Sequence, residues 1–201
     1  MHSLSIVISA PSGAGKSTII REIINRTDYL DFAVSSTTRV RREGEIDGKD
    51  YHFISPEQFQ SDIESGGFVE WAVVHGNYYG TTQKEIDRIR RDGKIPLFDV
   101  DVQGARSLKD NLYGAVFIFI LPPSLRELEE RLRKRRTDTD EQIEIRMGQA
   151  RTEISKSSMF DYIVINRNVK TAVDDVMAVV RASTLKFEYS EKKIDDILGE
   201  R

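Results

Sequence analysis

The chain has 201 residues, of which 39% are hydrophobic and 31% are charged, and its formal net charge is −3. This length predicts one compact domain with room for small insertions, while the charged fraction excludes an integral membrane protein and the lack of a basic excess argues against a polynucleotide partner. Because it has no cysteine and only three widely separated histidines, disulfide scaffolds, cysteine nucleophiles and thiolate zinc sites are excluded, and a histidine-built metal centre is not expected.

Apolar runs separated by helical patterns predict an α/β fold with a parallel central sheet. A strand is expected at 4–9, followed by a helix from about 16 to 26 whose isoleucines recur at helical spacing. Further buried strands are expected at 95–100, 116–121 and 162–165. Strands covered on both faces read as continuous apolar runs. The longest apolar run, 115–121, is far shorter than the ~20 residues that span a bilayer, so we expect a cytoplasmic protein with no membrane partner.

Two segments depart from this alternation. Residues 37–84 contain short β-like runs, glycines and paired tyrosines, which predicts a small insertion of mixed α+β character. Residues 126–151 are densely charged and read as helical and solvated, with capping-box patterns at Ser124 and Thr139. The predicted core would then comprise three pieces: 1–36, 85–125 and 152–201.

Residues 10–17 read Ala-Pro-Ser-Gly-Ala-Gly-Lys-Ser between the first strand and the first helix. This is the context of a phosphate-binding P-loop, in which backbone N–H groups surround phosphates at a helix N-terminus. Ala10 replaces the usual first glycine, which a negative φ would allow. Lys16 is expected to reach the transferring phosphates and Ser17 to approach Mg²⁺. The predicted ATP contacts in the loop are Ser12, Gly13, Ala14, Gly15, Lys16, Ser17 and Thr18.

Two aspartates follow the predicted strand at 95–98. Carboxylates at the carboxyl end of a parallel strand face the ligand crevice. Asp99 is therefore expected to help hold Mg²⁺ through water, and Asp101 to accept hydrogen bonds from a second substrate. The alternative is two solvated loop aspartates. A P-loop by itself does not separate GTPase switches, ATPase motors and small-molecule kinases.

Three further motifs help to distinguish among these classes of P-loop protein. They are Ser-Ser-Thr-Thr-Arg at 35–39, Gly-Asn-Tyr-Tyr-Gly at 76–80 and Asp-Val-Asp-x-Gln-Gly at 99–104. Together with the P-loop, they resemble the guanylate kinase family over about residues 4–190. The resemblance implies a P-loop NTPase-type three-layer fold with an NMP-binding insertion and a helical lid. It also implies phosphorylation of GMP, and of dGMP, by ATP with Mg²⁺ as cofactor.

The resemblance also implies roles for individual residues. Ser35, Glu70, Thr81 and Asp101 match positions that read the guanine base. Arg39, Arg42, Tyr51 and Tyr79 match positions that bind the GMP phosphate, and Glu45 would hold the arginines. Arg131, Arg135 and Arg146 match phosphate-contacting arginines of the lid, although Arg136 replaces a glycine there. Asn166 matches a position beside the adenine, followed by Arg167 where many relatives have an acidic residue.

These residues predict in-line phosphoryl transfer that needs charge neutralisation but no general base. One alternative is another nucleoside-monophosphate kinase, which the Glu70 and Asp101 pair disfavours. A second is a peptide-binding guanylate-kinase-like scaffold domain, disfavoured by the intact Gly15-Lys16-Ser17. A GTPase switch lacks its Asn-Lys-x-Asp segment here. The sequence does not decide between GMP and dGMP as the preferred substrate. It also leaves the oligomeric state open, with a homo-oligomer as one alternative.

Overall fold

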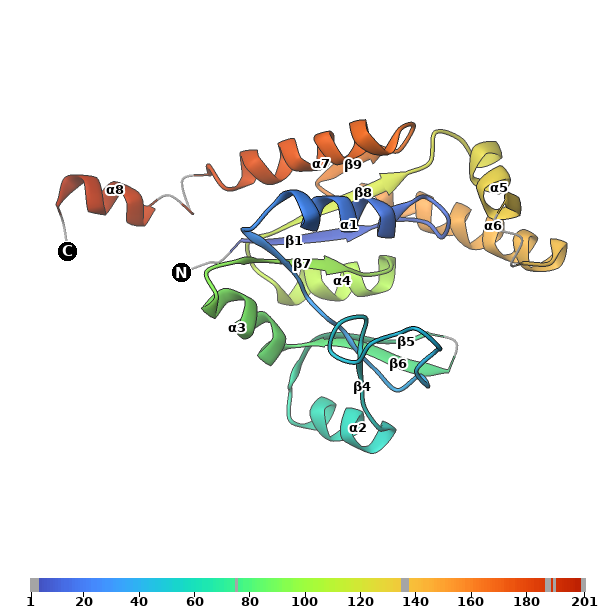
Figure 1. The fold of residues 1–201 in the computed structure, drawn as a ribbon, viewed down its shortest axis with the longest axis horizontal. Coiled ribbons are helices and arrows are strands. Elements are labelled where there is room, and N and C mark those ends of the chain that lie inside the picture. The colour runs from blue at the N-terminus through green and yellow to red at the C-terminus, as the bar shows by residue number, and fades with distance from the viewer. Residues whose placement is uncertain (1–3, 75, 135–137, 187–188, 190, 200–201) are drawn as a thin grey trace.

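The structure is a computed structural model that describes residues 4–74, 76–134, 138–186, 189 and 191–199 (Figure 1). The strands are β1 (Ser5–Ser9), β2 (Leu30–Phe32), β3 (Ser36–Thr37), β4 (His52–Phe53), β5 (Phe68–Val74), β6 (Asn77–Thr82), β7 (Ile95–Asp99), β8 (Ala115–Leu121) and β9 (Tyr162–Ile165). The helices are α1 (Lys16–Arg26), α2 (Pro56–Glu64), α3 (Gln83–Arg91), α4 (Val102–Asn111), α5 (Leu125–Lys134), α6 (Asp140–Ser155), a short 3-10 turn (Ser157–Met159), α7 (Val169–Ser183) and α8 (Glu191–Leu198).

The central sheet is parallel, as predicted. Within the described residues it has five strands in the order β2-β7-β1-β8-β9, and each neighbouring pair is parallel. The chain leaves β1 toward β2 on one side and later reaches β8 on the other. The carboxyl end of β1 is therefore a point where the strand order reverses, which is where ligands bind in open α/β sheets.

Alternating residues of β1 face two different helical layers. Ile6 and Ile8 are fully buried in a cluster with residues of α1 and α7, whereas Val7 is buried in a cluster with residues of α3 and α4. Figure 1 shows the same arrangement, with α1 and α7 along one face of the sheet and α3 and α4 along the other. The period-two alternation of a strand thus produces the predicted three layers.

A second, mixed sheet is formed between residues 36 and 82. Its strand order is β4-β3-β6-β5, with β3 parallel to β4 and antiparallel to β6. Helix α2 packs on this sheet through Phe59, which is fully buried and stacks on Phe68 and Tyr78 at ring-centroid distances of 4.2 and 5.1 Å. The mixed character is confirmed, while the proposed boundaries at 37 and 84 stay a prediction.

The predicted capping patterns are present to different degrees. Thr139 and Gln142 form the full reciprocal capping box of α6. Ser124 accepts the Glu127 N–H at 3.1 Å. Helix α2 has a comparable cap in the structure, in which Ser55 accepts the Gln58 N–H at 3.2 Å and Pro56 is the first helical residue. These caps satisfy N–H groups that have no partner within their own helix.

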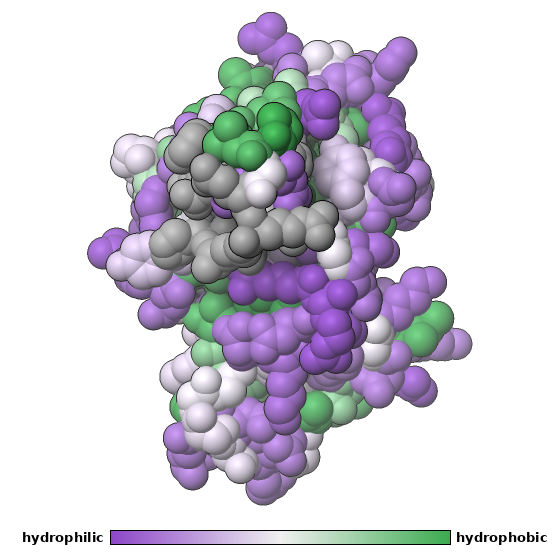
Figure 2. All heavy atoms as spheres, turned by 90° about the vertical axis from the view of Figure 1, so that its left-hand side faces the viewer, coloured by the Kyte–Doolittle hydropathy of each residue, from purple (hydrophilic) through white to green (hydrophobic). Residues whose placement is uncertain are grey.

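Strand β2 and helix α8 were not expected from the sequence. Strand β2 spans three residues with Asp31 in its centre, which is too short for hydrophobic periodicity to register. Helix α8 exposes Ile194, Ile197 and Leu198, and Figure 2 shows hydrophobic side chains gathered over it on an otherwise mainly hydrophilic face. Among the described helices, none combines the length and the apolar composition that a bilayer crossing requires.

Candidate active site

The loop between β1 and α1 has the backbone conformation of a phosphate cradle. Gly13 and Gly15 have φ values of 91° and 97°, the left-handed region that favours glycine. The Ala14 N–H donates to the Pro11 carbonyl at 3.0 Å, which closes the turn. Gly15 then leads directly into α1, so the positive end of that helix dipole faces the loop.

Lys16 connects this loop to the end of β7. Its ammonium forms an ion pair with Asp99 and donates to the Val100 carbonyl at 2.7 Å. Asp99 is the last residue of β7, and β7 lies beside β1 in the sheet. The parallel strands therefore bring two side chains that are 83 positions apart into direct contact.

Asn166, which follows β9, also lies against the loop. Its Nδ2 donates to the Ala14 carbonyl at 2.8 Å, and its Oδ1 is buried with no partner among the described residues. Arg131 of α5 donates to the Asn166 carbonyl at 2.8 Å and pairs with Glu127 at 2.6 Å. Thr18 lines a hollow together with Gly13, Gly15, Arg131 and Asn166. The loop, helix α5 and the residue after β9 thus meet at one place.

We expect Gly15→Ala to destabilise the fold. A Cβ at this position would lie 2.5 Å from Asn166 Nδ2, and the left-handed backbone adds a further cost. The unfolding free energy should fall by about 2 kcal/mol or more, measured by denaturant titration.

Gly148→Ala is the matched control, because this helical glycine has nothing within 4 Å of its would-be Cβ. It should stabilise α6 by about 0.5–1 kcal/mol through helix propensity. Equal effects from the two substitutions would contradict the close packing assigned to Gly15.

A buried carboxylate lies on the second sheet. Glu70 of β5 is 5% exposed, and its Oε1 accepts the Thr81 hydroxyl at 2.8 Å. Thr81 Oγ1 is also 3.2 Å from Ser35 Oγ. Burial, with a smaller contribution from Asp101, raises the pKa of Glu70 to about 7. Three of the four predicted base-reading residues are therefore in contact.

Asp101, the fourth of them, immediately precedes α4. Its Oδ1 accepts the Gly104 N–H at 2.8 Å, so it caps the helix as well as facing the cavity described next. A Cβ on Gly104 would lie 3.1 Å from Val100 Cβ and 3.3 Å from Glu70 Oε2. Glycine at 104 therefore allows α4 to approach the buried Glu70 closely. The alternative of two solvated loop aspartates does not hold for Asp101.

One cavity of about 340 Å³ extends from the phosphate loop to the buried Glu70 on the second sheet. Side chains from the loop and strand ends line it together with side chains from the second sheet: Lys16, Phe32, Ser35, Asp50, Tyr51, Glu70, Ala72, Val74, Tyr79, Asp99, Val100, Asp101 and Gly104. Its volume lies in the range of small-molecule sites. A basic group and several carboxylates therefore face the same space.

The predicted phosphate-binding residues form an adjoining network. Arg39 Nη2 lies 2.6 Å from Glu45 Oε1, and its guanidinium lies over the Tyr51 ring at 5.5 Å. The Tyr51 and Tyr79 rings are 5.8 Å apart in an edge-on arrangement. Arg42 donates its backbone N–H to Glu45 at 2.8 Å, while its side chain is exposed. Glu45 thus contacts both arginines, and Arg39 chiefly lowers the pKa of its carboxyl.

Helix α6 contributes two groups near the P-loop. Arg146 lies 3.4 Å from Ser12 Oγ and pairs with Asp138 at 3.2 Å. Glu153, which sequence reasoning missed, has a buried Oε2 with no partner among the described residues, and burial followed by Asp101 raises its pKa. Its position seven residues after Arg146, on the same helix face, was the available signal. The predicted Arg135, with its neighbour Arg136, lies outside the described residues.

The donor set for a metal ion consists of oxygen atoms. Ser17 and Asp99 line a common cavity, and a hydroxyl with a carboxylate suits Mg²⁺, which keeps several waters and takes few protein ligands. Within the described residues, no group of three or more His, Cys, Asp or Glu side chains could hold a metal by itself. The residues present therefore fit a magnesium ion carried in with a nucleotide.

The parallel sheet and its glycine-rich loop define the class of the protein as a P-loop NTPase fold. The structure resembles a crystal structure of guanylate kinase from Anaplasma phagocytophilum, with a TM-score of 0.74 and 30% identity over 96% of this chain and 95% of that one. The family model described as guanylate kinase matches residues 2–183.

Curated relatives give the same result. Guanylate kinases from Geobacter metallireducens and Syntrophotalea carbinolica are 48% and 45% identical, covering 88% and 93% of this chain and 87% and 91% of their own. The guanylate kinase of Thermotoga maritima is 43% identical over 97% of this chain and 94% of its own. The chain belongs to the guanylate kinase family, and this membership supports phosphotransfer from ATP to GMP, yielding GDP.

Proposed function

We propose that this protein transfers the γ-phosphoryl group of Mg-ATP in line to the α-phosphate of GMP, and of dGMP, with release of ADP. The observation that carries this proposal is the single cavity lined by both Lys16 and the Glu70–Asp101 pair. A phosphate-binding cation and a guanine-reading carboxylate then face one substrate-sized space.

Guanine is selected in this proposal by its N1–H and N2–H donors. Ionised Glu70 accepts from that edge, while Asp101 and the hydroxyls of Ser35 and Thr81 complete the reading. Adenine carries no proton at N1 and would leave the buried carboxylate unpaired. Such a site rejects the wrong base strongly, because an unpaired buried charge is costly.

The GMP phosphate is held in this proposal by two arginines and two tyrosines. Arg39 and Arg42 supply charge, and Tyr51 and Tyr79 supply hydroxyls. An anionic oxygen of GMP attacks Pγ, the new O–Pγ bond forms as the bond from Pγ to the bridging oxygen breaks, and ADP leaves with that oxygen. Because the nucleophile is already an anion, no general base is needed.

The ATP side is assigned to the P-loop and the lid. Ser12 to Thr18 surround the phosphates, Lys16 neutralises charge on the transferring group, and Arg131, Arg135 and Arg146 approach from the lid. The orphan Oδ1 of Asn166 would accept from the adenine amino group. Ser17, with Asp99 acting through water, would hold Mg²⁺, which supplies charge neutralisation to the phosphates.

We also propose that residues 37–84 and 126–151 act as an NMP-binding insertion and a lid that close on the core, made of 1–36, 85–125 and 152–201. Closure would exclude water from the reacting phosphates and limit ATP hydrolysis.

The direct test is ADP release from Mg-ATP with GMP, dGMP, AMP, UMP or TMP as acceptor. GMP and dGMP should be the fastest acceptors by a wide margin. A fastest rate with AMP or with a pyrimidine nucleotide would contradict the assignment of Glu70, Asp101, Ser35 and Thr81.

The reaction should also depend on pH through Glu70. Its pKa of about 7 lies above its ordinary value. The value of kcat/KM for GMP should therefore fall as the pH drops below 7, because the Glu70 carboxylate that accepts the guanine hydrogen bonds becomes protonated. Thr81 lowers this pKa, so Thr81→Ala should move the midpoint upward. An unmoved midpoint in that variant would assign the titration to another group, such as the nucleotide phosphate.

A further inference from the structure

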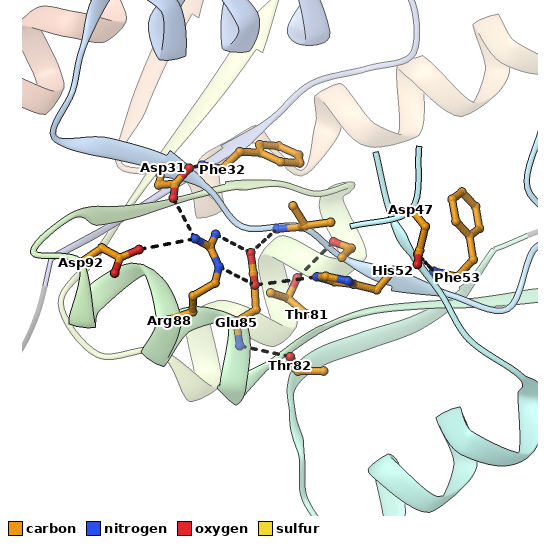
Figure 3. Close-up of polar contacts among 12 residues, drawn as sticks. Asp31, Phe32, Asp47, His52, Phe53, Thr81, Thr82, Glu85, Arg88 and Asp92 are labelled. Atoms are coloured by element: carbon orange, nitrogen blue, oxygen red, sulfur yellow. Dashed lines mark hydrogen bonds and ion pairs between the residues drawn. The ribbon is translucent and has the colours of Figure 1, made fainter. Parts of the chain in front are cut away.

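A second buried carboxylate, Glu85, does not line the 340 Å³ cavity and lies at the junction of the two sheets. Glu85 is in the first turn of α3 and is 6% exposed. Its oxygens accept the Val34 N–H at 3.1 Å and the Arg88 Nε–H and Nη2–H at 3.0 and 2.9 Å. Arg88 in turn pairs with Asp31 of β2 at 3.1 Å. Figure 3 shows Arg88 between Asp31, Asp92 and Glu85.

The same carboxylate faces the second sheet. Glu85 Oε2 lies 3.8 Å from His52 Nε2 of β4, and Figure 3 shows His52 on the side of Glu85 opposite Arg88. The His52 backbone N–H donates to the Ser35 carbonyl at 2.9 Å. Val34 and Ser35 connect β2 of the central sheet to β3 of the second sheet. Glu85 therefore contacts this connection at Val34 and also lies close to His52, whose backbone is hydrogen-bonded to Ser35.

Two of the proposed base-reading hydroxyls, those of Ser35 and Thr81, are connected to Glu85 through neighbouring backbone groups. Glu85 holds the backbone N–H of Val34, one residue before Ser35. Ser35 Oγ lies 3.2 Å from Thr81 Oγ1, which donates to Glu70. Thr82 Oγ1 caps α3 by accepting the Glu85 N–H at 3.2 Å, so α3 is also tied to the residue after Thr81. A shift of Glu85 would move both Ser35 and Thr81.

We propose that Glu85 is a positioning residue for GMP selection, which fixes the 33–35 connection through Val34 and thereby aligns Ser35, Thr81 and Glu70 with the guanine edge. This inference rests on the proposed function. Burial acts to raise the pKa of Glu85, but the hydrogen bonds from Arg88 and Val34 outweigh it and the pKa is lowered. Glu85 is thus an anion at neutral pH, and Arg88 compensates its charge.

The test is steady-state kinetics of Glu85→Ala and Glu85→Gln with both substrates varied. Glu85→Ala removes the acceptor for Val34 and should raise KM for GMP about tenfold, because a hydrogen bond to a buried charged group is lost. KM for ATP and kcat should stay within about twofold. Glu85→Gln keeps an acceptor oxygen but not the charge, and should lie between wild type and alanine.

Asp87→Ala is the matched control, because Asp87 is an exposed carboxylate on the same helix and contacts Gln83 at 2.8 Å. It should leave both KM values unchanged. An unchanged KM for GMP in Glu85→Ala, or equal changes in kcat and both KM values, would overturn the proposal. If Glu85→Ala does not fold, Glu85→Gln decides by the same criterion.

Failure of the proposed function would give a different result. A wild-type protein that does not prefer GMP to AMP would contradict the function itself. A wild-type preference for GMP that Glu70→Gln abolishes and Glu85→Ala leaves intact would overturn only the role of Glu85.

Discussion

Lys16→Met is expected to reduce kcat for ADP formation about a hundred- to a thousandfold, the range found for loss of one donor that stabilises transition-state charge. Methionine keeps the length and apolar character of the lysine stem but removes the ammonium. The ammonium contacts Asp99 and the Val100 carbonyl in the present structure. The transferring phosphates would compete for it when ATP binds.

The control for Lys16 is Lys170→Met, which changes an exposed lysine in the first turn of α7. This variant should retain wild-type turnover. Thermal unfolding of both variants separates chemistry from stability, because Lys16→Met also leaves the Asp99 carboxylate without its ion pair. Retention of most of the turnover by folded Lys16→Met would contradict the role of Lys16.

Glu70→Gln should lower kcat/KM for GMP about a thousandfold, with little change in the slow rate with AMP, because a mispaired polar group in a base-reading site costs most for the correct base. Glutamine has nearly the same shape as glutamate but turns one acceptor into a donor. The amide would then face donors on guanine. The ratio of GMP to AMP rates should therefore collapse.

Stability should respond to Glu70→Gln in the opposite direction. Glu70 is 5% exposed and burial raises its pKa, so ionising it above pH 7 costs folding free energy. The glutamine variant should be at least as stable as wild type at pH 8, measured by thermal unfolding. Glu64→Gln, on the exposed side of α2, should change neither stability nor selectivity. Loss of stability with unchanged selectivity would contradict the assignment.

The elements that the sequence predicted are those with long, uniform patterns. Strand β9 and helix α1 have the predicted bounds, because a continuous apolar run and a repeating isoleucine face each carry a strong signal. Strand β2 was missed because three residues around Asp31 show no period. The second sheet was expected only as mixed structure, since β3 and β4 have two residues each.

The site residues, too, separate into those that a local sequence pattern identified and those that it did not. The Gly-Lys-Ser motif identifies Lys16 because loop, spacing and flanking elements all lie within one short segment. The charged cluster around Glu85 has no such signal. Arg88 is three residues from Glu85 on the same helix, but Asp31, Val34 and His52 come from three other elements or connections, and no local pattern relates these to Glu85.

The sequence alone determined the class of fold, the phosphate loop and, through family motifs, the residues expected to read guanine. Those properties depend on local spacing and on residue type. Only the tertiary structure decided that Lys16 pairs with Asp99, that Glu70 is buried against Thr81, and that one cavity joins them. Burial and ion pairing depend on distances between segments that are remote in the chain, and those distances exist only after the two sheets have packed.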